Sequence, residues 1–455
     1  MKYRYLMTLM VFLAAWGCKS SEKDKYSDAA INKRVDSVMK LMTLEEKIGQ
    51  LTLFTSDYDV TGPTMRENYK EDLKQGRAGA IFNAWGVKYV RELQRIAVEE
   101  SRLGIPLIFG YDVIHGHRTI FPISLGEAAS WDTAAVRQAA RIAAIEATAE
   151  GLNWTFAPMV DIARDPRWGR ISEGSGEDVF LGVAMARARV KGFQKHDLKS
   201  PNTLLACAKH YAAYGAAQAG RDYHTVDMSE RTLREVYLPP FKACVEEGVG
   251  TFMTSFNEIA GVPATGSRFL LTDILRKEWG FHGFVVTDYT SINEMVPHGF
   301  AANEKHAGEL ALNAGVDMDM QGAVFYNYLK QSIDEGKVNI KDVDEAVRRV
   351  LRMKFRLGLF DDPYLYCNKE REKTEIMTPE HLAFARDLAR KSMVLLKNEN
   401  NVLPLSKQNS TLAVIGPLAH NRRELIGSWS AAGDWKKAVT VLEGIQRTVP
   451  HGTKI

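Results

Sequence analysis

The chain has 455 residues, of which 45% are hydrophobic and 25% are charged. This length exceeds one ordinary core and predicts either two domains or one large barrel with part of a second domain. Its 59 Lys and Arg residues against 56 Asp and Glu residues give a formal net charge of +3, with no long basic run, so the composition does not indicate a nucleic-acid partner.

Residues 1–18 have the layout of a secretory signal. Two basic residues precede an apolar run over residues 6–15, and the small Gly17 stands before Cys18. The run is shorter than the roughly 20 apolar residues that a spanning helix needs. Cys18 after a small residue resembles the bacterial lipoprotein signal, in which that Cys is lipidated. We therefore expect export to the periplasm or outer membrane, membrane attachment only through a lipid on Cys18, and a polar tether over residues 19–34.

The cysteines give no sign of a disulfide framework. Beyond Cys18 the chain has Cys207, Cys244 and Cys367, an odd number at wide spacing, and two of the three lie within apolar runs. This pattern is typical of buried thiols rather than of disulfides or a zinc site.

Short apolar segments alternate with helical stretches along the chain. Between the segments, apolar residues recur at spacings of three and four, which is the helical period. Near-continuous apolar strands that alternate with helices indicate a parallel sheet, and a count near eight favours a (β/α)8 barrel, an α/β fold, over an open sheet. The predicted strands lie in residues 48–54, 78–84, 106–112, 153–161, 204–210, 250–258, 283–289 and 314–320.

Polar residues end most of these segments. In a (β/α)8 barrel the carboxyl ends of the strands form the active-site face, so these residues are expected to converge on one rim. For Asp161, Asp317 and Asp319, capping of the following helix is an equal alternative. The capping alternative is weaker for Asp288, because Thr290 and Ser291 follow it and could cap the helix instead. The polar residues in question are Asp112, Asp161, Lys209, His210, Asn257, Glu258, Asp288, Asp317 and Asp319.

Residues at this rim also suggest two other chemistries, metal binding and Schiff-base formation. His115 and His117 form an HxH pair that could bind a metal, with Asp288 completing a metal-dependent barrel hydrolase, but the motif alone is weak and loop-shaping hydrogen bonds are the better interpretation. Lys209 could form a Schiff base. Its neighbour His210 and the nearby carboxylates favour instead a charged hydrogen-bond donor to a substrate.

Five longer segments carry a more specific signal. They read GYDVIHGHRTIFPISLGEAASWD, FAPMVDIARDPRWGRISEGSGED, AKHYAAYGAAQAGRDYHTVDMSER, MTSFNEIAGVPATG and GFVVTDYTSI. In this order they resemble glycoside hydrolase family 3, especially its bacterial exported β-glucosidases. A further stretch, ARKSMVLLKNENNVLPL followed by TLAVIGPLA, resembles the beginning of that family's second domain, an α/β sandwich. The resemblance implies a barrel over residues 35–360, a linker over 361–389 and the start of the sandwich over 390–455.

The resemblance assigns a role to the carboxylate that ends the seventh strand. The family's nucleophile is the Asp of the GFVVTD-type strand, which maps onto Asp288. This implies a retaining, exo-acting β-glycosidase, in particular a β-glucosidase, that forms a glycosyl-enzyme on Asp288. Its substrate would be a β-linked oligosaccharide or β-glucoside, and no cofactor or metal is expected. The family usually has a Tyr under the reactive centre where this chain has Phe256, so a hydroxyl group is missing there.

Four residues map onto the family's sugar-binding motifs, namely Asp112, Arg170, Lys209 and His210. Carboxylates and cationic donors suit a neutral ring that is dense in hydroxyl groups. We expect the three basic residues to lower the pKa of Asp288 by favouring its charged form. Candidates for an aromatic face against the sugar, although each is more typical of the core, are Trp85, Trp131, Trp154 and Trp168.

A retaining mechanism also needs a second carboxyl group, as acid and base. In β-glucosidases of this family it is generally a Glu on the second domain, whereas the chain ends about forty residues after TLAVIGP. We therefore expect residues 390–455 to be an unfinished domain that buries little and is protease-sensitive. A catalytically weak sugar-binding fragment is the alternative function. Candidates for an acid within the chain are Glu173, Glu177, Asp222, His224 and Glu294.

Overall fold

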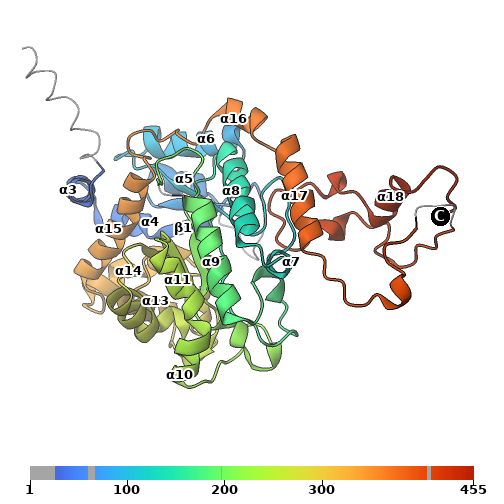
Figure 1. Ribbon diagram of the computed structural model, residues 1–455. Helices are drawn as coiled ribbons and strands as arrows, with labels where there is room; N and C mark the ends of the chain where they lie inside the picture. Colours follow the sequence, from blue (N-terminus) through green and yellow to red (C-terminus); the bar gives the residue numbers. More distant parts are fainter. Residues whose placement is uncertain (1–25, 60–66, 196, 407–410) are drawn as a thin grey trace, which may run out of the picture.

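The computed structural model describes residues 26–59, 67–195, 197–406 and 411–455. The expected signal over residues 1–18, with Cys18, lies outside the described residues. In Figure 1 a rounded body holds most of the chain, and the C-terminal segment extends from one side of it. None of the described helices combines the length and the apolar character that crossing a membrane requires.

Eight parallel strands form the centre of the body, each overlapping one predicted segment. They pair in the orders β10-β1-β2-β3-β4 and β5-β6-β9. Parallel bridges from Trp154 to Leu205 and from Val286 to Met318 join the two sheets into a closed ring, so the predicted (β/α)8 barrel is confirmed. The strands are β1 Thr52–Thr55, β2 Ala80–Phe82, β3 Ile108–Tyr111, β4 Trp154–Thr155, β5 Cys207–Tyr211, β6 Thr251–Thr254, β9 Phe284–Val286 and β10 Asp319–Met320; β7 Glu258–Ile259 and β8 Val262–Pro263 form a hairpin after β6.

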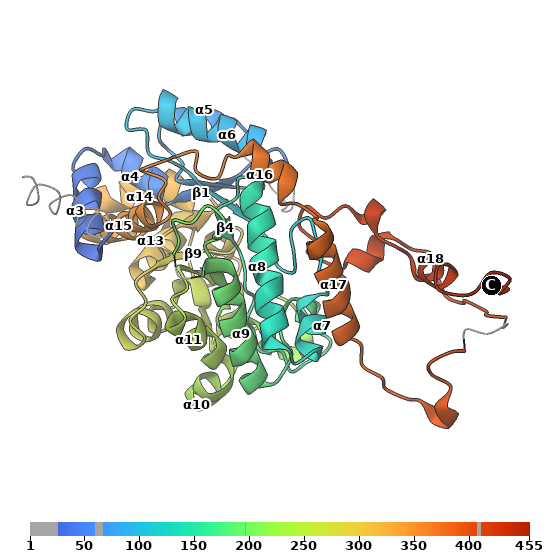
Figure 2. The same ribbon diagram turned by 45° about the horizontal axis from the view of Figure 1, so that its top comes forward.

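Helices surround the strands (Figure 1 and Figure 2). Two of the long helices, α8 and α9, are capped at their N-termini by Asp132 and Asp178, whose side chains accept hydrogen bonds from first-turn N–H groups. The α-helices and π-helical stretches are α3 Asp28–Met39, α4 Leu44–Gln50, α5 Tyr69–Lys74, α6 Val87–Arg95, the π-helical stretch Ile96–Glu100, α7 Ser124–Ala129, α8 Thr133–Ala149, α9 Val179–Gln194, α10 Glu230–Thr232, the π-helical stretch Leu233–Tyr237, α11 Pro239–Glu246, the π-helical stretch Phe269–Glu278, α12 Ser291–Glu294, α13 Glu304–Ala314, α14 Val324–Asp334, α15 Ile340–Arg356, α16 Lys369–Thr374, α17 Pro379–Lys391 and α18 Val441–Gln446.

Large side chains fill the interior of the barrel. Trp154 is fully buried, packs edge-on against Phe284 with ring centroids 5.2 Å apart, and donates its indole N–H to Thr251 at 2.9 Å. Cys207 and Cys244 are buried free thiols, as predicted, and Cys367 is partly buried. The barrel is therefore a packed core, and only its rim is open to a ligand.

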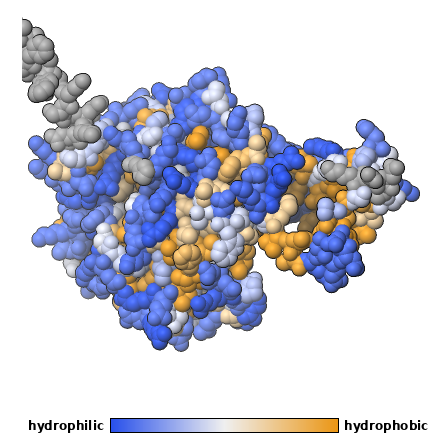
Figure 3. Space-filling view, in the orientation of Figure 1, coloured by the Kyte–Doolittle hydropathy of each residue, from blue (hydrophilic) through white to orange (hydrophobic). Residues whose placement is uncertain are grey.

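The C-terminal segment contrasts with this core. In the part of residues 390–455 that the structure describes, the buried residues are Ala432 and Thr440, whereas Leu396 and Ile415 are 91% and 90% exposed. Figure 3 shows hydrophobic side chains gathered on this segment. The expectation that it buries little is confirmed, while its protease sensitivity stays a prediction.

Candidate active site

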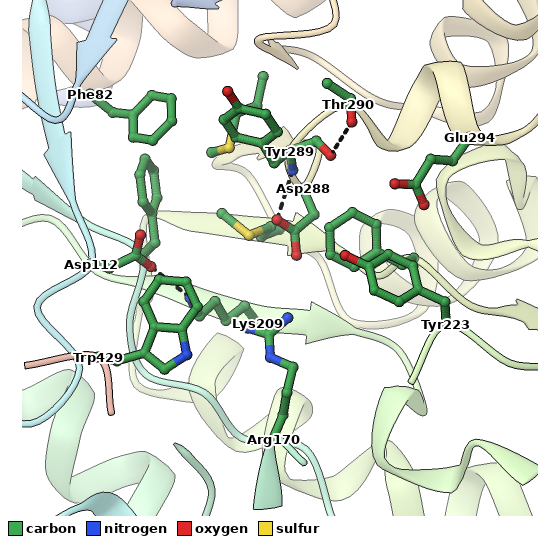
Figure 4. A pocket seen from close by; sticks show the side chains of 14 residues that line it. Phe82, Asp112, Arg170, Lys209, Tyr223, Asp288, Tyr289, Thr290, Glu294 and Trp429 are labelled. Atoms are coloured by element: carbon green, nitrogen blue, oxygen red, sulfur yellow. Dashed lines mark hydrogen bonds and ion pairs between the residues drawn. The ribbon is translucent and has the colours of Figure 1, made fainter. Parts of the chain in front are cut away.

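A pocket opens at the carboxyl ends of the strands, with about 700 Å³ of empty space including its open mouth. Five predicted site residues line it, and the sixth, His210, lies fully buried behind its wall. The lining residues, most of them labelled in Figure 4, are Phe82, Asp112, Phe156, Arg170, Lys209, Tyr223, Met253, Phe256, Asp288, Tyr289, Thr290, Glu294, Met320 and Trp429.

Asp112 and Lys209 form an ion pair on one side of this pocket. Asp112 follows β3 and Lys209 lies in β5, and Nζ is 2.8 Å from Oδ1. The side chains are only 16% and 3% exposed, so the charges are held in place with little water around them. Such a pair offers an acceptor and a donor side by side, which suits neighbouring hydroxyl groups of a sugar.

Arg170 is held by Glu173. Its Nε and Nη2 atoms donate to the two carboxylate oxygens at 2.6 and 3.0 Å, and Glu173 is 2% exposed. Both oxygens of Glu173 are thus occupied, and this residue is not among those lining the pocket. Glu173 therefore positions Arg170 and is unsuited to the role of acid, although it was one of the candidates.

His210 contacts Arg170 and is itself oriented by Asp161. Its Nδ1 atom lies 2.9 Å from Oδ2 of Asp161, and its Nε2 atom lies 2.9 Å from Nη2 of Arg170. Burial, aided by the positive charges of Arg170 and Lys209, holds the pKa of His210 well below its usual value. The ring is therefore neutral, donates from Nδ1 to Asp161, and accepts the guanidinium N–H at Nε2. Asp161 orients this ring and does not cap a helix.

Asp288 points into the middle of the pocket (Figure 4). Its Oδ1 atom accepts the N–H of Tyr289 at 2.7 Å, whereas Oδ2 has no hydrogen-bond partner in the described part of the chain. The expectation of a lowered pKa is wrong. Burial raises the pKa of Asp288 to about 6, because desolvation outweighs the lowering by Arg170 and Lys209. The carboxylate is still ionised at neutral pH, and its free oxygen can attack a carbon atom.

Asp317 and Asp319, in the last predicted strand segment, have structural roles. Oδ2 of Asp319 accepts the N–H groups of Val324 and Phe325 at 2.7 and 3.1 Å, which caps α14 as the alternative interpretation proposed. Asp317 binds Arg349 at 2.8 Å and accepts the N–H of Val285 at 2.7 Å, and so ties β9 to α15.

The histidine pair near Asp112 shapes a loop. The two ring nitrogens of His115 lie 2.9 and 2.6 Å from the backbone oxygens of Phe121 and Ser428, and Nε2 of His117 lies 2.6 Å from Glu150. Neither histidine lines the pocket with Asp288. In the described ranges no group of three or more His, Cys, Asp and Glu residues is placed to hold a metal ion, so the loop-shaping interpretation is the one supported.

Glu294 is the one acid candidate that reaches the pocket among the described residues. Burial, and then the charges of nearby carboxylates, raise its pKa to about 7. Glu177 and His224 are exposed outside the pocket. Asp222 accepts the indole N–H of Trp168 at 2.9 Å, which makes it a loop-bracing residue.

One aromatic residue of the pocket, Trp429, comes from the C-terminal segment. The ring centroid of Trp429 lies 5.8 Å from the guanidinium carbon of Arg170 and 5.6 Å from Nζ of Lys209. Its neighbours are fixed to the barrel, because the carbonyl of Ser428 meets His115 and the carbonyl of Ala432 accepts from Arg118 at 2.9 Å. Sequence reasoning missed Trp429; its flanking residues GSWSAAG, without strand or helix periodicity, were the available signal.

The four tryptophans that the sequence suggested do not line the pocket. Trp154 and Trp168 are less than 2% exposed within the core. Trp85 packs edge-on against His117, and Trp131 faces solvent with 69% of its surface exposed. The more typical core role holds for two of them.

Comparisons with known proteins agree with this geometry. The Glycosyl hydrolase family 3 N terminal domain matches residues 43–353, and the family's C-terminal domain matches residues 393–454. A periplasmic beta-glucosidase of Salmonella typhimurium is 46% identical over 92% of this chain and 55% of its own length. A beta-xylosidase of Formosa agariphila is 34% identical over 100% of this chain and 61% of its own length.

Solved structures give the same result. The beta-glucosidase from Listeria innocua in complex with glucose superimposes with a TM-score of 0.86 at 37% identity, over 92% of this chain and 59% of that one. The chain thus spans little more than half the length of these relatives. The match over 43–353 covers most of the chain, and the chain belongs to glycosyl hydrolase family 3.

Proposed function

We propose that this chain supplies the nucleophile and the sugar-binding groups of a retaining, exo-acting β-glucosidase. The observation that carries the proposal is the buried Oδ2 atom of Asp288, which has no hydrogen-bond partner in the described part of the chain and lies in the pocket that Asp112, Lys209 and Arg170 line. In the proposed reaction, this oxygen attacks the anomeric carbon of a terminal β-D-glucosyl residue, and the bond to the leaving group breaks. Water then releases the sugar from the glycosyl-enzyme.

The roles of the polar groups follow from their contacts. The Asp112–Lys209 pair accepts from and donates to sugar hydroxyl groups, and Arg170 donates from a position that Glu173 and His210 fix. Phe256 and Trp429 supply apolar faces on the walls. A ring bound by several charge-assisted hydrogen bonds keeps its anomeric carbon at a fixed distance from Asp288, which is the positioning that catalysis requires.

Glucose is the proposed sugar. The support is the 46% identity to a periplasmic beta-glucosidase and the fit to a beta-glucosidase in complex with glucose, whereas the beta-xylosidase relative is less similar at 34%. Comparing dinitrophenolate release from β-glucoside and β-xyloside tests this choice. A higher rate with the glucoside is expected, and a higher rate with the xyloside would reassign the sugar. No release from either would favour the sugar-binding alternative.

We also propose that the protein is exported, with a signal over residues 1–18 and a lipid on Cys18 at the end of the tether 19–34. The periplasmic relative supports export. The proposed division into a barrel at 35–360, a linker at 361–389 and a second domain from 390 is supported by family matches that fall within those bounds. Radiolabelled fatty acid should enter the wild-type protein and not Cys18→Ser.

A further inference from the structure

At position 256 the pocket wall has an aromatic ring without a hydroxyl group. Phe256 follows β6, lines the pocket and is 6% exposed, but its ring can donate no hydrogen bond. Oδ2 of Asp288 has no partner in the described part of the chain. When a glycosyl-enzyme breaks down, the negative charge returns to this carboxylate, and a donor nearby would stabilise it.

Tyr223 brings a hydroxyl group to this place from another loop. The residue lies between β5 and α10, and its ring packs on Phe256 with centroids 4.5 Å apart and planes tilted by 39°. On the other side it meets the edge of Tyr214 at 6.2 Å. Tyr223 lines the pocket, and Figure 4 shows its hydroxyl end directed toward Asp288.

The surroundings of Tyr223 keep this hydroxyl group a donor. Tyr223 is 44% exposed. Its pKa is nevertheless raised to about 12, first by partial desolvation in the pocket and then by the negative charges of Glu294, Asp288 and Asp222. The phenol is therefore protonated at every pH at which the protein would work. Within the described residues the hydroxyl makes no hydrogen bond to another group of the protein, so its proton is available to the pocket. Tyr223 also adopts a left-handed backbone conformation with φ 65°, which is uncommon for a non-glycine residue.

We propose that Tyr223 donates a hydrogen bond to the Asp288 carboxylate when the glycosyl-enzyme is cleaved, in place of a hydroxyl at position 256. In that step the bond between the anomeric carbon and the Asp288 oxygen breaks, and both electrons stay on the carboxylate. The incoming nucleophile forms the new bond to carbon, and Tyr223 keeps its proton. This inference rests on the proposed function of Asp288.

The test uses the full chain and a 2-fluoroglucoside with a dinitrophenyl leaving group, followed by intact mass. Formation of the adduct reports attack by Asp288, and its removal by azide reports cleavage without any proton to be abstracted. Tyr223→Phe is expected to slow removal at least about tenfold, as for the loss of a hydrogen bond to a charged group. Adduct formation and its pH midpoint should stay close to wild type, because Oδ2 of Asp288 has no hydrogen-bond partner before the sugar is attached, within the described residues.

Rescue separates this role from a merely structural one. The double variant Tyr223→Phe with Phe256→Tyr moves the hydroxyl group to the neighbouring ring, and it should recover most of the lost rate of adduct removal. Tyr214→Phe is the matched control: it removes a buried hydroxyl from the ring that contacts both Tyr223 and Phe256, and both steps should stay within about twofold of wild type.

Two results would overturn the inference. One is a Tyr223→Phe variant that forms and loses the adduct like wild type, and the other is a double variant that remains as slow as Tyr223→Phe. If wild type forms no adduct, it is the proposed function that fails. If Tyr223→Phe unfolds, Phe256→Tyr alone decides. It should change the rate of azide removal by less than about threefold, because Tyr223 already supplies the donor, and a gain of about tenfold or more would overturn the inference.

Discussion

Nε2 of His210 lies 3.6 Å from Oδ2 of Asp288 and does not donate a hydrogen bond to it. The histidine proton is on Nδ1, where Asp161 accepts it, so Nε2 is an acceptor and receives the N–H of Arg170. The carboxylate thus lies close to a neutral ring and keeps one oxygen free. A donor in place of Nε2 would stabilise the carboxylate and weaken it as a nucleophile.

The buried carboxylate predicts how labelling depends on pH. The pKa of Asp288 is raised to about 6, and only the ionised form attacks. The rate of labelling by the dinitrophenyl 2-fluoroglucoside should therefore be maximal near neutral pH, half-maximal near pH 6 and low at pH 5. Rates measured across this range check the prediction, and a rate unchanged down to about pH 4 would contradict the environment described for this group.

Lys209→Met should move that midpoint upward. The substitution removes a positive charge that lowers the pKa of Asp288 and leaves Asp112 unpaired, whose charge raises it. Glucose binding should weaken roughly 10- to 100-fold, because hydrogen bonds to a charged group are lost. The same pH series and a glucose titration measure both effects.

The control for this substitution is Lys330→Met on the protein surface, where the side chain is 59% exposed. It should leave the midpoint and the affinity unchanged. An equal shift in both variants would mean that net charge, rather than the Asp112–Lys209 pair, sets the pKa.

Trp429→Ala tests the contribution of the C-terminal segment to the pocket. Loss of the indole removes an apolar wall beside Arg170 and Lys209. We expect about 1–2 kcal/mol of lost binding energy for an aryl glucoside, or roughly 5- to 30-fold in affinity. Trp435→Ala, in the same segment and outside the pocket, is the matched control. Equal losses in the two variants would argue against a wall formed by Trp429.

A buried lysine near the amino ends of β1 and β2, away from the pocket, predicts how the free energy of unfolding depends on pH. Lys354 is fully buried, and its Nζ donates to Gln50 and to the carbonyl of Gly79 at 2.6 and 2.8 Å. Burial lowers its pKa from 10.5 to about 7. Between these two pH values the unfolded chain binds the proton and the folded chain does not. The free energy of unfolding therefore rises with pH from about 7 toward 10.5, and this contribution of Lys354 is lost as the pH falls through 7.

Lys354→Met should remove this rise. Between about pH 7 and 9 the free energy of unfolding of the wild type should rise by about 2 kcal/mol more than that of the variant. Urea unfolding at fixed ionic strength measures it. A variant with the same pH dependence as wild type would show that Lys354 stays protonated in the folded state.

Sequence reasoning predicted the barrel because each strand has its own local signal, an apolar run that ends in polar residues. The parallel strands then bring Asp112, Lys209 and Asp288 to one rim. The direction of the Asp288 pKa shift could not be predicted from the sequence. It depends on how far Asp288, Arg170 and Lys209 are buried and how far apart they lie. Trp429 was missed because it reaches the pocket from a segment with no regular pattern, more than 200 residues after Lys209.

The most direct test of the central claim is to find the residue that carries the sugar. After labelling with the dinitrophenyl 2-fluoroglucoside and digestion, peptide mapping should place one adduct on Asp288, and Asp288→Asn should bind glucose and form no adduct. An adduct on another residue, or labelling of Asp288→Asn at the wild-type rate, would contradict the assignment of the nucleophile.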